Sequence, residues 1–204
     1  MSKHSPENIH PIFSELVSRR ERERFLNQKA GVFWLTGLSG SGKSTIAKHV
    51  ERLLFQSGFF PQVLDGDNIR TGVCNNLSFS LEDRNENIRR IAEVAKLYVN
   101  SGIVVLCSFI SPTRAIRAMA EDIIGEADFY EIFVDAPVAL CEERDVKGLY
   151  AKARSGLIKG FTGIDSPYEA PVSPALRIDT SKLSEEDSTN EVLSFIIDQV
   201  KIHS

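Results

Sequence analysis

The chain has 204 residues, of which 42% are hydrophobic and 25% are charged, and its formal net charge is −4. This length suits one domain with a short arm, and the hydrophobic share is ample for a buried core. The acidic balance argues against a nucleic-acid binder, since such proteins usually carry a basic surplus.

The N-terminal residues 1–28 are predicted to form an arm and a short helix, and residues 29–204 one α/β domain. Ser18 followed three residues later by Glu21 is a capping box, which predicts a helix that runs to about Gln28. We interpret the alternating charges of this helix as a solvated face. No apolar signal core precedes it, and no apolar run in the chain approaches the ~20 residues that span a bilayer.

From residue 31 onward, apolar runs and helical periodicity alternate five times. The runs predict strands at 32–35, 62–64, 103–107, 129–134 and 176–178, and the periodic segments predict helices that end before 58 or cover 80–101, 112 onward, 138–144 and 191–202. The run 103–107 lacks alternation, as strands covered on both faces do. We therefore expect a doubly wound, mainly parallel five-stranded sheet with helices on both faces and ligands at the carboxyl ends of its strands.

Local signals place some of the helix starts. Ser80 with Asp83 is a second capping-box candidate, and Ser111 before Pro112 predicts a helix whose N-cap is the serine. One segment breaks the rhythm: residues 147–174 contain four glycines and three prolines. A long structureless segment in a compact domain is usually a lid or a binding loop, so we predict a mobile lid there.

A phosphate-binding loop is the strongest signal in the chain. Residues 37–44 match G-x-x-x-x-G-K-[ST] in full and lie between a predicted strand and a predicted helix. Glycines let backbone N–H groups surround phosphate oxygens, and the helix N-terminus adds its dipole. Lys43 is expected to reach the β- and γ-phosphates, and Ser44 to bind Mg²⁺. The loop that would hold ATP consists of Gly37, Leu38, Ser39, Gly40, Ser41, Gly42, Lys43 and Ser44.

Two further groups of polar residues are candidates for an acceptor site. Residues 65–70, DGDNIR, follow the second strand at its carboxyl end, where a carboxylate can accept a hydroxyl proton or hold a metal through water. Arg84 and Asn87 are three apart and share a helix face, where they can clamp an anion while Phe79 stacks on a base. Taken alone, these residues are equally consistent with a turn, solvated arginines and a core phenylalanine.

Together these stretches resemble the adenylylsulfate kinase family of P-loop kinases. The shared motifs are GLSGSGKST at 37–45, DGDNIR at 65–70 and the spaced pairs FS, DR, EN and RR between 79 and 90. FISP at 109–112, VDAP at 134–137, RDVKGLY at 144–150 and KGFTGID at 159–165 follow. The resemblance runs from about Ser18 to the C-terminus, and this order of motifs is specific to the family.

The resemblance implies an enzyme of sulfate assimilation that transfers the γ-phosphoryl group of ATP to the 3′-hydroxyl of adenosine 5′-phosphosulfate. It implies that Gly40 to Thr45 hold ATP, and it gives catalytic roles to Lys43, Asp65, Ser111 and Lys147. Asp65 is our expected base, partly from its position. The implied acceptor pocket consists of Asp67, Asn68, Ile69, Arg70, Phe79, Arg84, Asn87, Ile110, Ser111, Lys147, Gly160 and Phe161, with the rings of Phe79 and Phe161 on either side of the adenine.

Ser111 has two interpretations. It matches a serine described as a phosphoserine intermediate in bacterial members of the family, which would make this chain a phosphoprotein. In the alternative, it caps the following helix and positions the acceptor. We favour the second, because the acceptor brings its own hydroxyl, Asp65 can serve as its base, and no histidine or lysine adjoins Ser111 in the sequence.

The chain departs from the family pattern at three points, one of which is YAKAR at 150–154 in place of YKKAR, with one charge fewer near the lid. Ser78 stands where the family usually has glycine, so we expect the loop before Phe79 to adopt a different conformation. The predicted strand 103–107 ends without the aspartate of a Walker B motif. Magnesium would then depend on Ser44, the phosphates, water and Asp65.

Two other functions remain open from the residues themselves: a P-loop kinase for a sugar acid or a nucleoside, and a nucleotide-binding regulatory subunit without turnover. The DGDNIR and KGFTGID motifs argue against the first, and the intact Lys43, Ser44, Asp65 and Lys147 against the second. The separated Cys74, Cys107 and Cys141 suit neither a disulfide framework nor a zinc cluster, which predicts a reducing, cytoplasmic setting. The resemblance also suggests a homodimer, and a separate ATP sulfurylase is a candidate functional partner.

Overall fold

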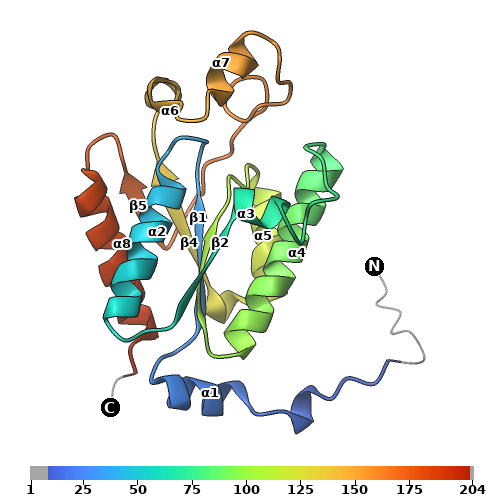
Figure 1. Cartoon of the computed structure of the whole chain (residues 1–204), viewed down its shortest axis with the longest axis vertical. Helices are drawn as coiled ribbons and strands as arrows, with labels where there is room; N and C mark the ends of the chain where they lie inside the picture. Colours follow the sequence, from blue (N-terminus) through green and yellow to red (C-terminus); the bar gives the residue numbers. More distant parts are fainter. Residues whose placement is uncertain (1–8, 203–204) are drawn as a thin grey trace.

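A five-stranded parallel sheet forms the centre of the computed structural model, which describes residues 9–202 (Figure 1). The strand order is β2-β3-β1-β4-β5, and every neighbouring pair is parallel. The predicted doubly wound α/β sheet is therefore confirmed. The strands are β1 (Gly31–Thr36), β2 (Pro61–Asp65), β3 (Val104–Ser108), β4 (Phe129–Asp135) and β5 (Leu176–Asp179).

Helices cover both faces of this sheet. One layer consists of α2 (Lys43–Gln56) and α8 (Glu185–Val200), and the opposite layer of α4 (Leu81–Asn100) and α5 (Arg114–Ile124) (Figure 1). Within residues 9–202, no helix combines the length and the apolar content that crossing a membrane requires. The shorter helices are α1 (Arg19–Leu26), α3 (Gly66–Arg70), α6 (Val138–Arg144) and α7 (Leu149–Arg154), with 3-10 turns η1 (Phe13–Glu15) and η2 (Glu126–Asp128).

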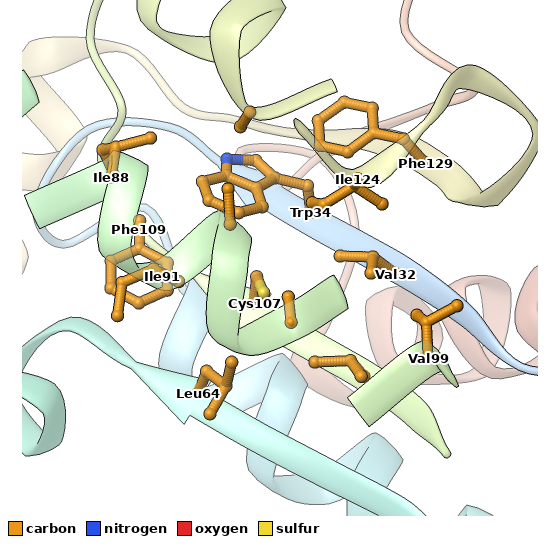
Figure 2. Packing of buried hydrophobic residues seen from close by; sticks show 14 of the residues in the cluster. Val32, Trp34, Leu64, Ile88, Ile91, Val99, Cys107, Phe109, Ile124 and Phe129 are labelled. Carbon is orange, nitrogen blue, oxygen red and sulfur yellow. The ribbon is translucent and has the colours of Figure 1, made fainter. Parts of the chain in front are cut away.

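The central strands are buried on both faces, which explains why their sequences do not alternate. Trp34 of β1 is the largest fully buried side chain and packs in the core between the sheet and α4 and α5 (Figure 2). Its ring centroid lies 5.6 Å from that of Phe109 and 5.7 Å from that of Phe129. The packing fixes the strands whose carboxyl ends carry the functional loops.

Helix α1 lies at the end of the sheet where the strands begin (Figure 1). The predicted capping box is present, with Ser18 accepting from the amide of Glu21 and the Glu21 carboxylate accepting from that of Ser18. Arg19 donates to both carboxylate oxygens of Asp128 at 2.6 and 2.8 Å. Gln28 is fully buried and accepts from the amide of Phe60 at 2.7 Å. These contacts hold α1 against the sheet.

Two helix starts differ from the sequence prediction. Helix α8 begins at Glu185 rather than at 191, with Ser184 as its N-cap. Helix α5 begins at Arg114, and its N-cap is Thr113, whose hydroxyl accepts from the amide of Ile116. The prediction that Ser111 is this N-cap is therefore wrong. Threonine occupies the capping position because residues 111 and 112 still belong to the loop that leaves β3.

Two further local predictions need correction. Ser80 caps α4 as expected, but the Asp83 carboxylate accepts from the amide of Ser78 at 2.9 Å instead of completing a capping box. The segment 147–174 was predicted to lack structure, yet it contains α7, and Tyr150 and Phe161 belong to a small hydrophobic cluster there. This segment, which we call the lid segment, lies beyond the carboxyl ends of the strands (Figure 1).

Candidate active site

The phosphate-binding loop joins β1 to α2 over residues 37–42. Glycine is required at 37, because a Cβ atom there would lie 2.3 Å from the carbonyl oxygen of Val134. Helix α2 starts from Gly42, with no side-chain hydrogen bond at its N-cap. The amide groups of its first turn are therefore not satisfied by a capping side chain, and the helix dipole favours an anion at this position.

Lys43 is the first residue of α2; its side chain reaches back into this loop and the residue is 7% exposed. Its Nζ donates to the carbonyl of Leu38 at 2.7 Å. The pKa of Lys43 is lowered to about 8, mainly by burial, with Cys141 and Asp65 acting in the opposite direction and Lys147 adding to the decrease. The loop thus holds an ammonium group with few partners of its own, ready for phosphate oxygens.

A carboxylate and two hydroxyl groups meet beside the loop. Ser44 donates from Oγ to Oδ2 of Asp65 at 2.7 Å, and Ser108 lies 3.2 Å from Ser44 Oγ. Asp65 and Ser108 are paired residues at the ends of β2 and β3. Ser108 therefore stands at the end of the strand beside β1, where the sequence lacks an acid, and Asp65 supplies the carboxylate from one strand further out.

Helix α3 presents the acidic end of DGDNIR toward the lid segment. Asp65 caps this helix by accepting from the amide of Asp67 at 3.0 Å. The carboxylate of Asp67 forms an ion pair with Lys147, and both side chains are mostly exposed. Arg70 donates to the carbonyl of Ser78 at 3.0 Å. On the same helix, Asn68 is exposed, and Ile69 is half-buried and packs against the hydrophobic core.

Arg84 connects α4 to the lid segment. It donates to the carbonyl of Gly160 at 2.8 Å and to the hydroxyl of Thr162 at 3.1 Å. The Asp165 carboxylate accepts from the amides of Gly160 and Phe161 at 2.7 and 2.5 Å, which shapes the turn that Arg84 holds. In this arrangement the Arg84 guanidinium is directed at the lid segment.

The two rings expected on either side of an adenine differ in environment. Phe79 is 68% exposed, and the Arg70 guanidinium lies 4.3 Å from its ring centroid. Phe161 is 9% exposed and meets Tyr150 edge to face at 4.9 Å. Ser78 has no positive φ, so serine fits the loop before Phe79 without strain. Stacking on Phe161 requires the lid segment to uncover that ring.

Asn87 of α4 is 4% exposed, and its Oδ1 atom has no hydrogen-bond partner among the described residues. Buried polar atoms are usually paired, so an unpaired acceptor beside a predicted pocket calls for a donor from a ligand or from water. This atom suits an amino group such as the one that adenine carries.

Ser111 points inward. It is 3% exposed and has an unusual left-handed φ of 37°. Its Oγ accepts from Nε1 of Trp34 at 3.0 Å and donates to Oγ1 of Thr36 at 3.1 Å, and Thr36 in turn donates to the carbonyl of Ile110 at 2.8 Å. The hydroxyl therefore serves a buried network in the core rather than the phosphate-binding loop.

Several residues at the site were not singled out from the sequence. Tyr150 donates from its hydroxyl to the carbonyl of Ser39 at 2.8 Å, and Arg144 donates to the carbonyls of Gly40 and Thr180 at 3.3 and 2.8 Å. They brace the phosphate-binding loop from the lid side. Both lie in the RDVKGLY motif, whose spacing hinted at their importance but not at their partners. No sequence motif singles out Ser108, because its position beside Asp65 depends on the register of β2 with β3.

Comparisons with known proteins decide the family. A family model described as adenylylsulphate kinase matches residues 29–179. The chain belongs to the adenylylsulphate kinase family. An adenylyl-sulfate kinase from Bacteroides fragilis is 57% identical over 196 residues, covering 96% of this chain and 97% of the relative. Another from Lactiplantibacillus plantarum is 55% identical over 180 residues, covering 88% and 87%.

Solved structures agree with this family membership. The Mycobacterium tuberculosis APS kinase in complex with AMPPNP and APS has a TM-score of 0.79 and 48% identity, over 82% of this chain and 98% of that one. A hexameric APS kinase from Thiobacillus denitrificans has a TM-score of 0.64 and 28% identity, over 85% of this chain and 30% of that one. A Sinorhizobium meliloti gluconokinase, 18% identical with a TM-score of 0.56, shares the fold alone.

Proposed function

We propose that this protein transfers the γ-phosphoryl group of ATP to the 3′-hydroxyl of adenosine 5′-phosphosulfate, giving 3′-phosphoadenylyl sulfate and ADP. The observation that carries the proposal is the meeting of Lys43, Ser44 and Asp65 at the carboxyl ends of β1 and β2, in a chain of the adenylylsulphate kinase family. Phosphoryl transfer needs mainly positioning and charge stabilisation, which this arrangement supplies.

The residues divide the reaction between them. Lys43 and the amides of the phosphate-binding loop hold the β- and γ-phosphates and stabilise the charge that develops on them. Asp65 accepts the proton of the acceptor's 3′-hydroxyl, and the oxygen of that hydroxyl forms a bond to the γ-phosphorus. At the same time the bond between the γ-phosphorus and the β–γ bridging oxygen breaks, and ADP leaves. Lys147, paired with Asp67, brings a positive charge to the entrance of this site.

The donor set also suits magnesium. Mg²⁺ prefers oxygen ligands and is commonly held by one or two carboxylates, water and substrate phosphates. The Ser44 hydroxyl and the Asp65 carboxylate lie 2.7 Å apart and fit that requirement. When bound with ATP, the ion would neutralise phosphate charge at this position. The two residues would be its protein ligands, directly or through water.

Transfer is proposed to be direct, without a phosphoserine. The Ser111 hydroxyl is buried and committed to Trp34 and Thr36. A covalent route would need this hydroxyl to leave its partners and reach the γ-phosphate, whereas the acceptor brings a hydroxyl of its own. Ser111 is thus a positioning residue in this proposal.

A release assay for ADP tests the proposed activity. We expect ADP release from ATP to depend on added adenosine 5′-phosphosulfate, and the labelled γ-phosphate to appear on the 3′-oxygen. The matched acceptors are gluconate and adenosine. Turnover with one of those and not with the sulfate ester would show a different small-molecule kinase, and binding of ATP without any turnover would show a regulatory protein.

We further propose that the protein is a cytoplasmic homodimer whose substrate comes from a separate ATP sulfurylase. Three buried free cysteines support a reducing compartment. A set of exposed apolar side chains on the arm and α1 supports self-association: Ile9, Ile12, Phe13, Leu16, Val17 and Phe25. The sulfurylase link is supported by the substrate, whose formation requires adenylyl transfer to sulfate.

A further inference from the structure

One buried arginine, Arg117, binds the backbone of the loop that follows β3. Arg117 lies near the start of α5 and is 3% exposed. Its Nη1 donates to the carbonyl of Ser111 at 2.8 Å, its Nη2 donates to the carbonyl of Glu169 at 2.7 Å, and its Nε is paired with the Glu131 carboxylate. A single planar group therefore joins this loop, strand β4 and the far end of the lid segment.

We call residues 109–112 the acceptor loop and residues 168–170 the return arm of the lid segment. The two make further contacts of their own. The amide of Glu169 donates to the carbonyl of Pro112 at 2.8 Å, and the Tyr168 hydroxyl lies 3.0 Å from Thr36 Oγ1, which is also bonded to Ser111. The Arg117 guanidinium lies 5.8 Å from the Tyr168 ring centroid. The two segments are thus joined by several contacts besides those of Arg117.

The backbone of the acceptor loop needs this support. Ser111 has a φ of 37°, in a region that residues with a side chain adopt only when their surroundings impose it. Arg117 fixes its carbonyl and Trp34 fixes its hydroxyl. The same residue and its neighbour Ile110 are the ones expected to line the acceptor pocket. The conformation of that pocket wall therefore depends on contacts made on its far side.

We propose that Arg117 is a positioning residue for the acceptor. Because it donates to the carbonyls of both Ser111 and Glu169, the conformation of the acceptor loop depends on the position of the return arm. Arg117 itself contacts no substrate. The inference rests on the proposed function, because the acceptor gives the loop its role. Arginine suits this task because its guanidinium carries donors in several fixed directions, whereas the lysine ammonium is a compact point charge.

The variant Arg117→Lys tests the proposal, since it keeps a positive charge opposite Glu131. We expect its KM for adenosine 5′-phosphosulfate to rise about tenfold or more and its KM for ATP to stay within about twofold. The control is Arg114→Gln in the same helix. Arg114 donates through Nε to the carbonyl of Ala170 at 2.9 Å, so it contacts the return arm without reaching the acceptor loop. We expect both of its KM values to match the wild type.

A second measurement uses the unmodified protein and the amide of Glu169 as a reporter. Its hydrogen exchange should slow when ADP and adenosine 5′-phosphosulfate bind together, and ADP alone should leave it unchanged. This result decides the matter if Arg117→Lys does not fold.

Equal rises in the two KM values, the same rise in Arg114→Gln, an unaltered Arg117→Lys, or a Glu169 amide indifferent to the acceptor would each overturn the proposal. A wild-type protein without acceptor-dependent ADP release would instead refute the proposed function. An active wild type with an unaltered variant would refute only this inference.

Discussion

Lys43 combines burial with a charge that its task requires. Its low pKa means that the folded free enzyme holds fewer protons than the unfolded chain between about pH 8 and the ordinary lysine pKa of 10.5. The stability contributed by this group therefore rises with pH through that window. Affinity for ATP runs the opposite way, because the neutral amine attracts phosphate far less than the ammonium does.

We accordingly expect kcat/KM for ATP to fall as pH rises above about 8, by up to about tenfold per pH unit, since this parameter reports the pKa values of the free enzyme. Steady-state rates between about pH 7 and pH 10 measure the effect. The comparison is Lys43→Arg, whose guanidinium stays charged. The kcat/KM of its residual activity should not fall as the pH rises above about 8. A flat wild-type profile to the top of the range would contradict the role given to Lys43.

Ser111→Ala separates positioning from covalent catalysis. Removing the hydroxyl leaves the buried Trp34 Nε1–H without a partner, which should cost about 1–3 kcal/mol of unfolding free energy. Turnover should persist, because the acceptor supplies the attacking hydroxyl. The matched variant is Thr113→Ala, which removes the N-cap of α5, with a loss of about 0.5–2 kcal/mol and no effect on turnover.

Single-turnover kinetics with labelled ATP provide the decisive reading for Ser111. A phosphoserine that forms and decays as fast as product appears, together with an inert Ser111→Ala, would establish the covalent route and refute direct transfer.

Among the elements, α4 contacts the lid segment through Arg84. Arg84→Ala removes the bonds to Gly160 and Thr162, which as charged hydrogen bonds are worth about 1.5–3 kcal/mol each at most. We expect faster amide exchange over residues 155–166 in the free enzyme and a larger rise in KM for the acceptor than for ATP. In the wild type, nucleotide and acceptor bound together should slow exchange over the same residues.

Arg154→Ala is the control for this prediction. Arg154 also belongs to the lid segment, but within residues 9–202 its side chain pairs only with Glu142, at 2.7 Å, and it is mostly exposed, so its loss should matter little. Equal effects of the two substitutions on exchange and KM would show that Arg84 does not hold the lid segment.

Element boundaries show where sequence patterns stop being informative. The strands were located well because buried parallel strands are continuous apolar runs. Residues 185–190 contain no apolar side chain, so hydrophobic periodicity does not indicate the start of α8. The N-cap Ser184 is the one local signal for that start. The start of α5 was misplaced because a serine before proline is also a common loop feature, and the competing cap, Thr113, carries an equally short signal.

The site was predictable where chemistry depends on neighbours in sequence. The phosphate-binding loop is one continuous stretch whose spacing encodes its geometry. The Asp65–Ser108 pairing depends on the register of β2 with β3, and the contacts of Arg117 join residues 52 apart in the chain. Such arrangements are consequences of the whole fold, and local patterns carry no information about them.

For the molecule as a whole, the proposed homodimer depends on the apolar surface of the arm and α1. The arm and α1 border an apolar groove of about 570 Å³ lined by Val17, Phe25, Leu26, Phe60 and Ile103, among others. Phe25 is 89% exposed. Apolar surface of this kind supports the proposed homodimer, because a second copy of the chain would offer the same apolar surface in return.

Phe25→Asp should therefore weaken a homodimer. Full burial of a phenylalanine contributes about 1.5–3 kcal/mol, and in a two-fold symmetric contact each substitution acts twice, so the dimer should dissociate at least about a hundredfold more readily. The control is Phe55→Asp, since Phe55 is 65% exposed but lies on α2, in the layer that covers one face of the sheet. Sedimentation equilibrium at micromolar concentration measures both. A monomeric wild type, or equal weakening by the two substitutions, would show that α1 and the arm do not form the contact.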